Sequence, residues 1–86
     1  MYYTYILKSL KNGTLYTGQT NDLRKRLIQH NTGRSNFTKK NRPYKLIYYE
    51  ACINIEDSLS RELYLKTGIG KRYIKNRLKR FLSLTG

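Results

Sequence analysis

Acidic residues and cysteines are scarce in this chain of 86 residues. Five Asp and Glu stand against 18 Lys and Arg, so the formal net charge is +13. Such an excess of positive charge predicts a polyanionic partner, most simply nucleic acid. Scaffolding of structural RNA and binding to an anionic membrane surface are the alternatives that charge alone leaves open. The one cysteine, Cys52, excludes an internal disulfide and a zinc site built from cysteines, and it suits a reducing compartment.

Long apolar runs are also absent. No segment approaches the roughly 20 apolar residues that span a bilayer, and the N-terminus has neither the basic start nor the apolar stretch of a signal peptide. We therefore expect a cytoplasmic protein, associated with the nucleoid if it is bacterial, with no membrane partner. No repeat, linker or low-complexity segment divides residues 1–86, so we expect a single domain with a small core.

The residues that are present predict elements in the order ββαβαα. Runs rich in aromatic and β-branched residues predict strands, and apolar residues at helical spacing behind a capping Asn or Asp predict helices. This order gives a small α/β domain with a mixed or antiparallel three-stranded sheet flanked by helices. The predicted elements are strands over residues 2–9, 14–20 and 44–52, helices over 22–31, 55–67 (ended by Gly68) and 71–84 (after Gly70), and an exposed basic loop over 34–43.

The dipeptide Asn12-Gly13 predicts a two-residue turn between the first two strands. Such a turn places Tyr5 opposite Thr20. Because side chains alternate along a strand, Tyr5, Tyr16 and Gly18 are then expected on the same face of the sheet. A loop of another length would remove the basis of this expectation.

One arginine and the only histidine interrupt the apolar face of the first helix. Leu23 and Leu27 define that face, and on a helical wheel His30 lies about 20° and Arg26 about 60° from Leu23. An arginine turned toward the sheet needs a partner, because an unpaired buried charge is unfavourable. One interpretation gives Arg26 a structural role, with its guanidinium extended to solvent at the edge of the helix or paired with a carboxylate. The alternative is that it belongs to a functional site. His30 alone would be an ordinary helix residue.

Glu62 is the corresponding exception in the second helix. Ile55, Leu59 and Leu65 lie within about 60° of it on the helical wheel, so it is expected inside an apolar stripe. It either forms a structural ion pair with Arg26 or holds a divalent cation. Mg²⁺ is commonly bound by one or two carboxylates, with water and phosphate oxygens as its other ligands. One glutamate therefore suffices for a metal site that nucleic acid completes.

Basic residues are concentrated toward the C-terminus. Residues 66–80 carry seven Lys or Arg and no acid, at a spacing that predicts an amphipathic basic helix. Its charged side is either a solvated helix face or a surface that follows the phosphates of nucleic acid, and the basic loop would extend that surface. The residues expected to contact nucleic acid are Lys39, Lys40, Arg42, Lys66, Lys71, Arg72 and Lys75.

These residues coincide with the pattern of a known family. The chain resembles the GIY-YIG nuclease superfamily, in particular its small stand-alone bacterial branch, which is related to the nuclease domain of the excision-repair incision subunit. The first half-motif stands here as Tyr3-Thr4-Tyr5 and the second as Tyr16-Thr17-Gly18, with Tyr3 and Thr17 in place of the family's glycine and isoleucine. The family's arginine matches Arg26, its Tyr or His position matches His30, and its metal-binding glutamate matches Glu62.

The resemblance implies a metal-dependent endonuclease that hydrolyses phosphodiester bonds in DNA, in repair or recombination. In this hypothesis Glu62 holds Mg²⁺ or Mn²⁺, which stabilises the leaving oxygen. Arg26 stabilises negative charge on the phosphoryl oxygens, and Tyr5, Tyr16 and His30 position and deprotonate the attacking water. The ordinary pKa of histidine favours His30 as the base, the resemblance favours Tyr16, and both remain open.

Two other functions remain open at this stage. A nucleic-acid-binding module of the same fold without chemistry would explain the charge, as would a structural RNA-binding protein. A decayed site is expected to have lost at least one of its five polar residues, and an RNA scaffold leaves a glutamate in an apolar stripe unexplained. We therefore expect an active nuclease, a monomer or a weak dimer, whose partner is nucleic acid and most simply DNA.

Overall fold

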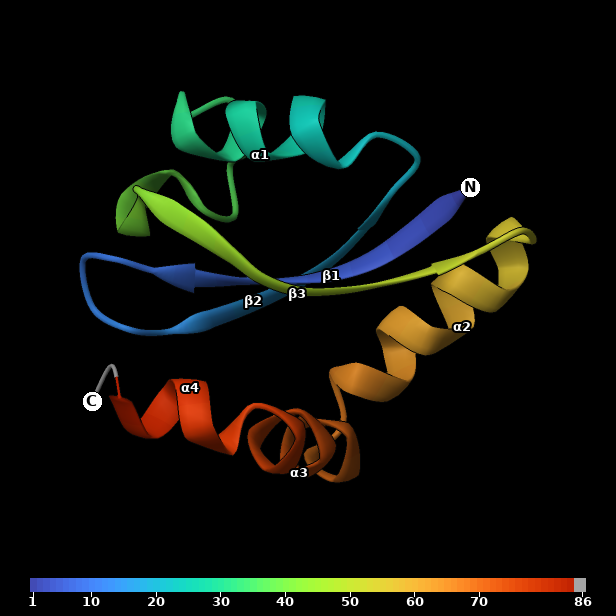
Figure 1. Cartoon of the computed structure of the whole chain (residues 1–86). Coiled ribbons are helices and arrows are strands. Elements are labelled where there is room, and N and C mark those ends of the chain that lie inside the picture. The colour runs from blue at the N-terminus through green and yellow to red at the C-terminus, as the bar shows by residue number, and fades with distance from the viewer. Residues whose placement is uncertain (85–86) are drawn as a thin grey trace.

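The computed structural model describes residues 1–84. Three antiparallel strands form one sheet in the order β2-β1-β3, with helices on both of its faces (Figure 1). The predicted α/β class and the order ββαβαα are confirmed, and the last predicted helix is divided in two. The elements are β1 (Tyr2–Ser9), β2 (Leu15–Thr20), α1 (Leu23–Asn31), a 3₁₀ helix (Lys39–Asn41), β3 (Tyr44–Cys52), α2 (Ile55–Leu65), α3 (Gly68–Arg77) and α4 (Lys79–Leu84).

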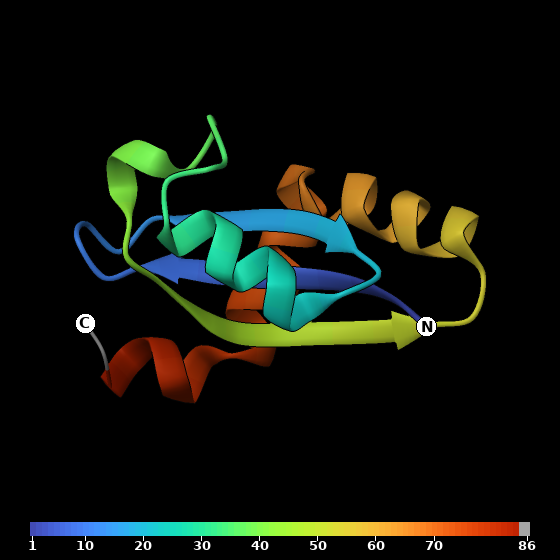
Figure 2. The same ribbon diagram turned by 90° about the horizontal axis from the view of Figure 1, so that it is seen from above.

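Two layers of helices enclose the sheet. α1 lies over one face, and α2, α3 and α4 lie against the other (Figures 1 and 2). The side chains of β1 alternate between the two layers. Tyr5 and Leu7 belong to a core under α1, whereas Ile6 packs with Leu65 and Ile74 in a second core under α2 and α3. Each face of the sheet therefore has its own small core.

The hairpin between β1 and β2 differs from the predicted two-residue turn. Thr20 pairs with Tyr3 instead of Tyr5, and Tyr5 pairs with Gly18. The register is therefore shifted by two residues, and the expected turn is wrong. An even shift leaves every side chain on its predicted side, because side chains alternate with a period of two. Tyr5, Tyr16 and Gly18 share the face under α1 as expected.

The longer hairpin loop is built around Ser9. The Ser9 hydroxyl accepts hydrogen bonds from the backbone N–H groups of Lys11 at 3.1 Å and Asn12 at 3.2 Å. The Gly13 N–H donates to the Ser9 carbonyl oxygen at 2.9 Å, and Gly13 has a φ of +78°, which glycine adopts readily. A serine at the end of the strand thus stabilises a wider loop than the one that Asn-Gly favours.

The segment between α1 and β3 is not the uniformly exposed loop that its composition predicts. Thr38 is 0% and Ser35 is 5% exposed. The carbonyl oxygen of Asn41 in the 3₁₀ helix accepts a hydrogen bond from the Ser9 hydroxyl at 2.6 Å, which joins the segment to the hairpin. The expectation of exposure holds for the charged side chains and is wrong for Ser35 and Thr38. The exposed charged residues are Arg34, Lys39, Lys40 and Arg42.

The C-terminal half contains three helices where two were predicted. α2 ends at Leu65, and Thr67 caps the next helix, its hydroxyl accepting a hydrogen bond from the Gly70 N–H at 3.1 Å. Gly68 is therefore the first residue of α3 and not the end of α2. The predicted helix over 71–84 is interrupted at Leu78. Within the described residues, no helix has the length and apolar character needed to cross a membrane.

Candidate active site

Three aromatic side chains meet on the face of the sheet under α1. Tyr5 from β1 and His30 from α1 are buried, and Tyr16 from β2 is half-buried. The centroid of the His30 ring lies 5.0 Å from that of Tyr16 and 5.9 Å from that of Tyr5, and both contacts are edge-on. Two strands and a helix thus bring together three of the five residues predicted for the site.

His30 is held by both of its ring nitrogens. Nε2 lies 2.8 Å from the Tyr5 hydroxyl oxygen, and Nδ1 lies 2.7 Å from the Thr38 hydroxyl oxygen. Both partners are hydroxyl groups, which donate or accept, so either neutral tautomer satisfies both bonds. Thr38 is therefore a site residue that sequence reasoning missed. Nothing in its local sequence distinguishes it from the other polar residues of a basic loop.

The observed register explains Gly18. It pairs directly with Tyr5, and a Cβ atom at position 18 would collide with the Tyr5 hydroxyl and ring. A glycine lets the backbone of β2 lie close against the phenol. Any larger residue would displace the Tyr5 hydroxyl from His30.

Arg26 lies on α1 beside the aromatic cluster. It is half-buried, and its Nη1 donates a hydrogen bond to Gln29 Oε1 at 2.9 Å. Residues three apart on a helix are neighbours on its surface, which is the sequence signal that could have identified Gln29. Because glutamine is neutral, this partner orients the guanidinium without cancelling its charge.

Burial dominates the titration of two groups in the cluster. Burial, together with the Arg26 guanidinium, lowers the pKa of His30 to about 4. Burial raises the pKa of Tyr5 to about 12; Arg26 opposes this rise, and the charges of Tyr16 and Glu62 add to it. His30 is therefore neutral and Tyr5 protonated near pH 7.

Glu62 lies on α2, in the helical layer on the other face of the sheet from α1. Its side chain is 18% exposed, and its Oε2 lies 3.0 Å from Lys66 Nζ. Its charge contributes to the raised pKa of Tyr5 after burial and Tyr16, so the carboxylate lies within electrostatic range of the cluster. In the part of the chain that the structure describes, no ion pair joins Glu62 to Arg26. The hypothesis of a structural ion pair between Arg26 and Glu62 is therefore wrong.

The apolar stripe that singled out Glu62 faces the core only at its C-terminal end, where Leu65 is 1% exposed. Ile55 and Leu59 are 43% and 42% exposed, whereas Ser58 is fully buried. The Thr4 hydroxyl donates a hydrogen bond to the Ser58 carbonyl oxygen at 2.9 Å, so the backbone of α2 lies close against β1. A small residue permits this contact and turns the helix away from the predicted orientation. The expected stripe therefore holds at Leu65, with Glu62 half-buried beside it, and fails at Ile55 and Leu59.

A metal ion at this site would need ligands from outside the protein. Among residues 1–84, no three His, Cys, Asp or Glu gather closely enough to hold a metal. Of the other acids, Asp22 caps α1 and Glu50 pairs with Arg61. Divalent cations such as Mg²⁺ accept one carboxylate together with water and phosphate oxygens. Glu62 therefore fits such an ion as one ligand in a complex with nucleic acid.

The basic residues predicted to contact nucleic acid lie in two groups. One group occupies the segment after α1, and the other lies at the C-terminal end of α2 and on α3, across the sheet. Lys11 in the hairpin loop lies between them. Its Nζ donates a hydrogen bond to the Lys40 carbonyl oxygen at 3.0 Å, and Lys11 and Lys75 line the same cavity. Positive charge therefore continues around the end of the sheet that carries the hairpin. The groups are Lys39, Lys40 and Arg42, and Lys66, Lys71, Arg72 and Lys75.

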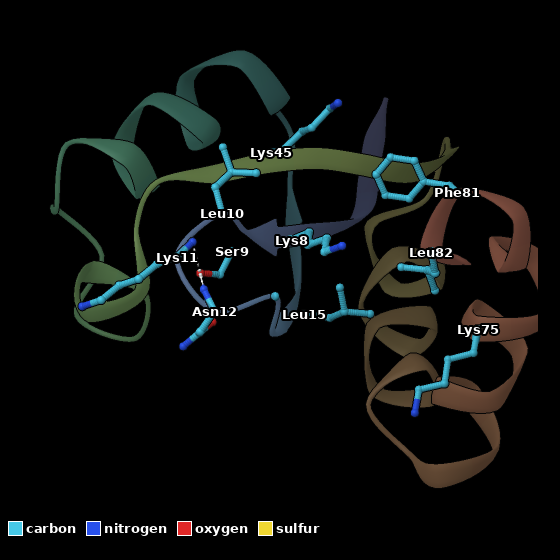
Figure 3. Close-up of a pocket in the computed structure, with 11 residues that line it drawn as sticks. Lys8, Ser9, Leu10, Lys11, Asn12, Leu15, Lys45, Lys75, Phe81 and Leu82 are labelled. Atoms are coloured by element: carbon cyan, nitrogen blue, oxygen red, sulfur yellow. Dashed lines mark hydrogen bonds between the residues drawn. The ribbon is translucent and has the colours of Figure 1, made fainter. Parts of the chain in front are cut away.

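A cavity lined by lysines lies between the hairpin and the C-terminal helices (Figure 3). It has a volume of about 740 Å³, and its lining comes from the hairpin, β3, α3 and α4. Lys8, Lys11, Lys45 and Lys75 line it, together with polar and apolar residues and no acid. The Nζ atoms of Lys8 and Lys45 lie 5.7 Å and 5.6 Å from the centroid of the Phe81 ring. This surface suits an anion but holds none of the five candidate site residues.

These features define a small α/β domain with a polar aromatic site, and residues 1–75 match the GIY-YIG catalytic domain. The chain therefore belongs to the GIY-YIG nuclease superfamily. No solved structure gives a significant match.

Bacterial relatives of similar length share much of the sequence. A UPF0213 protein of Staphylococcus saprophyticus is 40% identical over 75 residues, which cover 86% of this chain and 90% of the relative. A UPF0213 protein of Clostridium perfringens is 46% identical over 67 residues, covering 77% and 71%. One of Pediococcus pentosaceus is 39% identical over 85 residues, covering 98% and 88%. These names state no activity.

Proposed function

We propose that this protein is a metal-dependent endonuclease that hydrolyses phosphodiester bonds in DNA, in repair or recombination. The observation that supports the proposal most is Arg26, half-buried beside the aromatic cluster with a neutral hydrogen-bond partner. A guanidinium held in this way has its charge available for an anion. In a chain of net charge +13, that anion is most simply a phosphate of nucleic acid.

Arg26 acts on the phosphoryl group in this proposal. The oxygens around phosphorus gain negative charge as water attacks and the leaving oxygen departs. A cation already oriented toward them stabilises that charge without having to reorganise. The bond to Gln29, which uses Nη1, supplies the orientation.

Tyr16 is the residue that we expect to act as the base. In this proposal it first loses its phenol proton to solvent, and the phenolate then accepts the proton of the attacking water. It is half-buried, whereas Tyr5 and His30 are closed to solvent and hydrogen-bonded to each other. With a pKa of about 4, His30 is a weak base, and Tyr5, with a pKa of about 12, stays protonated. Tyr5 and His30 therefore act as positioning residues. These observations favour Tyr16 in the choice between Tyr16 and His30 that the sequence left open.

Glu62 is the residue that would hold a divalent ion. Bound there, Mg²⁺ or Mn²⁺ would supply positive charge to the leaving oxygen. Lys66 neutralises Glu62 before the substrate arrives. A phosphate of the nucleic acid offers Lys66 another partner, which would release the carboxylate for the metal.

A nucleic-acid-binding module without chemistry is the second candidate function. The Lys66–Glu62 ion pair favours it, because an ammonium 3.0 Å from Oε2 stands where a metal would bind. The two candidates share the basic surface and the same dependence of binding on salt. They differ in whether DNA is cut when a metal is added.

The test compares the parent with Glu62→Gln and Glu56→Gln on single-stranded, duplex and branched DNA, with and without Mg²⁺ or Mn²⁺. Glu56 is the matched control, since it is exposed in the first turn of the same helix. We expect metal-dependent cutting by the parent and by Glu56→Gln, and binding without cutting by Glu62→Gln. Equal cutting by Glu62→Gln, or no cutting by the parent on any substrate, would reject the nuclease.

A further inference from the structure

Phe37 is the most exposed aromatic residue of the described chain. It is 86% exposed, whereas the next, Tyr49, is 52% exposed. The other phenylalanine, Phe81, lies against two lysines. A single exposed aromatic ring does not indicate a binding site by itself. The residues around Phe37 have to indicate one as well.

The loop around Phe37 is held in place by buried neighbours. The Ser35 carbonyl oxygen accepts hydrogen bonds from the backbone N–H groups of Thr38 at 3.3 Å and Lys39 at 3.1 Å. Ser35 and Thr38 are 5% and 0% exposed, so both lie inward. The turn between them presents Phe37 to solvent. The outward ring therefore belongs to a hydrogen-bonded turn.

The same loop is joined to the candidate active site. Thr38, the residue after Phe37, contacts His30 Nδ1 through its hydroxyl at 2.7 Å. The segment follows α1 and lies at the hairpin end of the sheet (Figure 2). A nucleotide held by Phe37 would therefore lie next to the aromatic cluster.

The charge around Phe37 indicates which ligand fits. Residues 23–49 contain eight Lys or Arg and no acid. Cations for the phosphates and an aromatic ring for a base are the two parts of a surface that binds single-stranded nucleic acid. A second copy of this chain would bring two such positive clusters together, and one ring buries too little area to hold a membrane. The exposed cations within five residues of Phe37 are Arg34, Lys39, Lys40 and Arg42.

We propose that Phe37 stacks on an unpaired base of the nucleic-acid substrate, beside the active site. This inference rests on the proposed function and names the class of substrate, a strand with an unpaired nucleotide, as in single-stranded or branched DNA. A continuous duplex offers no free base face to the ring. Phe37 is a binding and positioning residue and takes no part in the chemistry.

The chain contains no tryptophan, so Phe37→Trp introduces a single fluorophore at the proposed contact. Ile53→Trp is the matched control. Ile53 is 84% exposed, in the connection between β3 and α2 at the opposite end of the sheet from the hairpin. Emission is measured in EDTA, so that nothing is cut, during titration with oligothymidylate, with an abasic strand of equal length, and with anionic lipid vesicles.

We expect oligothymidylate to quench the emission of Phe37→Trp and to leave that of Ile53→Trp unchanged. The abasic strand, which carries the same phosphates, is expected to bind without quenching. Equal quenching by the abasic strand, or none by either strand, would overturn the stacking proposal. So would a response to the vesicles, or a change with protein concentration alone, which would indicate a membrane or a second copy as the partner.

Affinity provides the second readout. Stacking on an aromatic ring predicts that Phe37→Leu binds oligothymidylate about 5- to 100-fold more weakly than the parent. Phe37→Tyr keeps the ring and is expected to bind as the parent does. The parent and both variants are expected to bind a continuous duplex equally. Parent-like binding of oligothymidylate by Phe37→Leu would overturn the proposal. Quenching in a protein that cuts no DNA would reject only the nuclease, and cutting without quenching would reject only the stacking.

Discussion

The two faces of the sheet each hold a half-buried arginine beside aromatic rings, and the two arginines differ in their partners. On one face, Arg61 of α2 donates from Nε and Nη2 to the two oxygens of Glu50, each at 3.0 Å. Its guanidinium carbon also lies 5.0 Å and 4.9 Å from the ring centroids of Tyr64 and Tyr73. On the other face, Arg26 of α1 donates from Nη1 to the neutral side chain of Gln29 at 2.9 Å.

This difference separates a structural arginine from one available to a ligand. Glu50 neutralises Arg61, and the Tyr48 hydroxyl completes the network by donating to Glu50 at 2.9 Å. An arginine paired in this way joins α2 to β3, and its neutralised charge attracts a phosphate only weakly. Arg26 keeps its charge beside Tyr5 and His30, which is costly for folding and useful for binding an anion.

Replacing Arg26 gives the largest expected effect. Arg26→Ala removes the cation that would stabilise the phosphoryl oxygens, so we expect the rate of DNA cutting to fall ~10²- to 10³-fold. Single-turnover cutting with saturating protein measures this rate. Arg26→Lys restores the charge without the planar fork and is expected to recover part of the rate. If Arg26→Ala cuts at the parent rate, the contrast between the two arginines has no functional meaning.

Lowering the pH should destabilise the face that holds His30. The pKa of His30 is about 4 in the folded chain and about 6.5 when unfolded, so below pH 6.5 the unfolded state binds a proton that the folded state excludes. The unfolding free energy should fall as the pH drops from 6.5 toward 4, by up to about 1.4 kcal/mol per pH unit, and this contribution should be constant above 6.5.

Urea unfolding of the parent and His30→Gln across this pH range provides the measurement. The variant lacks the titrating ring, so the difference between the two unfolding free energies should shrink as the pH falls. A difference that does not vary with pH would contradict the buried neutral imidazole.

The aromatic cluster shows how far the sequence could predict this protein. Periodicity and capping residues predicted the strands, α1 and the shared face of Tyr5 and Tyr16, because these depend on local alternation. The hairpin register failed because Ser9, through its own hydrogen bonds, stabilises a loop that Asn12-Gly13 does not suggest.

Contacts between distant segments account for the rest. The orientation of α2 depends on Ser58 meeting Thr4, and the helical wheel does not reveal that Ile55 and Leu59 in the apolar stripe are exposed. Thr38 was placed in an exposed loop because its neighbours are polar, and only the fold reveals that its hydroxyl contacts His30. Sequence pattern predicts which faces form, and packing decides which residues meet there.

Replacing Arg61 should lower stability and leave chemistry intact. Arg61→Ala strands the half-buried Glu50 carboxylate, and because both side chains are about 30% exposed, we expect a loss of only about 1–2 kcal/mol in the free energy of unfolding. Urea unfolding measures the loss, and the cutting rate per folded molecule should equal that of the parent. A ~100-fold drop in that rate, of the size expected for Arg26→Ala, would show that both faces take part in the reaction.

Single lysines on the two faces should have the smallest effects. Lys75 on α3 lines the cavity beside α4, and Lys40 lies in the segment after α1, on the other face of the sheet. If DNA follows positive charge around the hairpin end, then Lys75→Gln and Lys40→Gln should each lower the affinity for DNA by the same factor whatever the DNA sequence. Each should also reduce the slope of log K against log salt by about one. Fluorescence anisotropy at several salt concentrations measures the slope, with Lys79→Gln on α4, outside both surfaces, as the control. A changed slope for Lys40→Gln alone would confine the DNA to the face under α1.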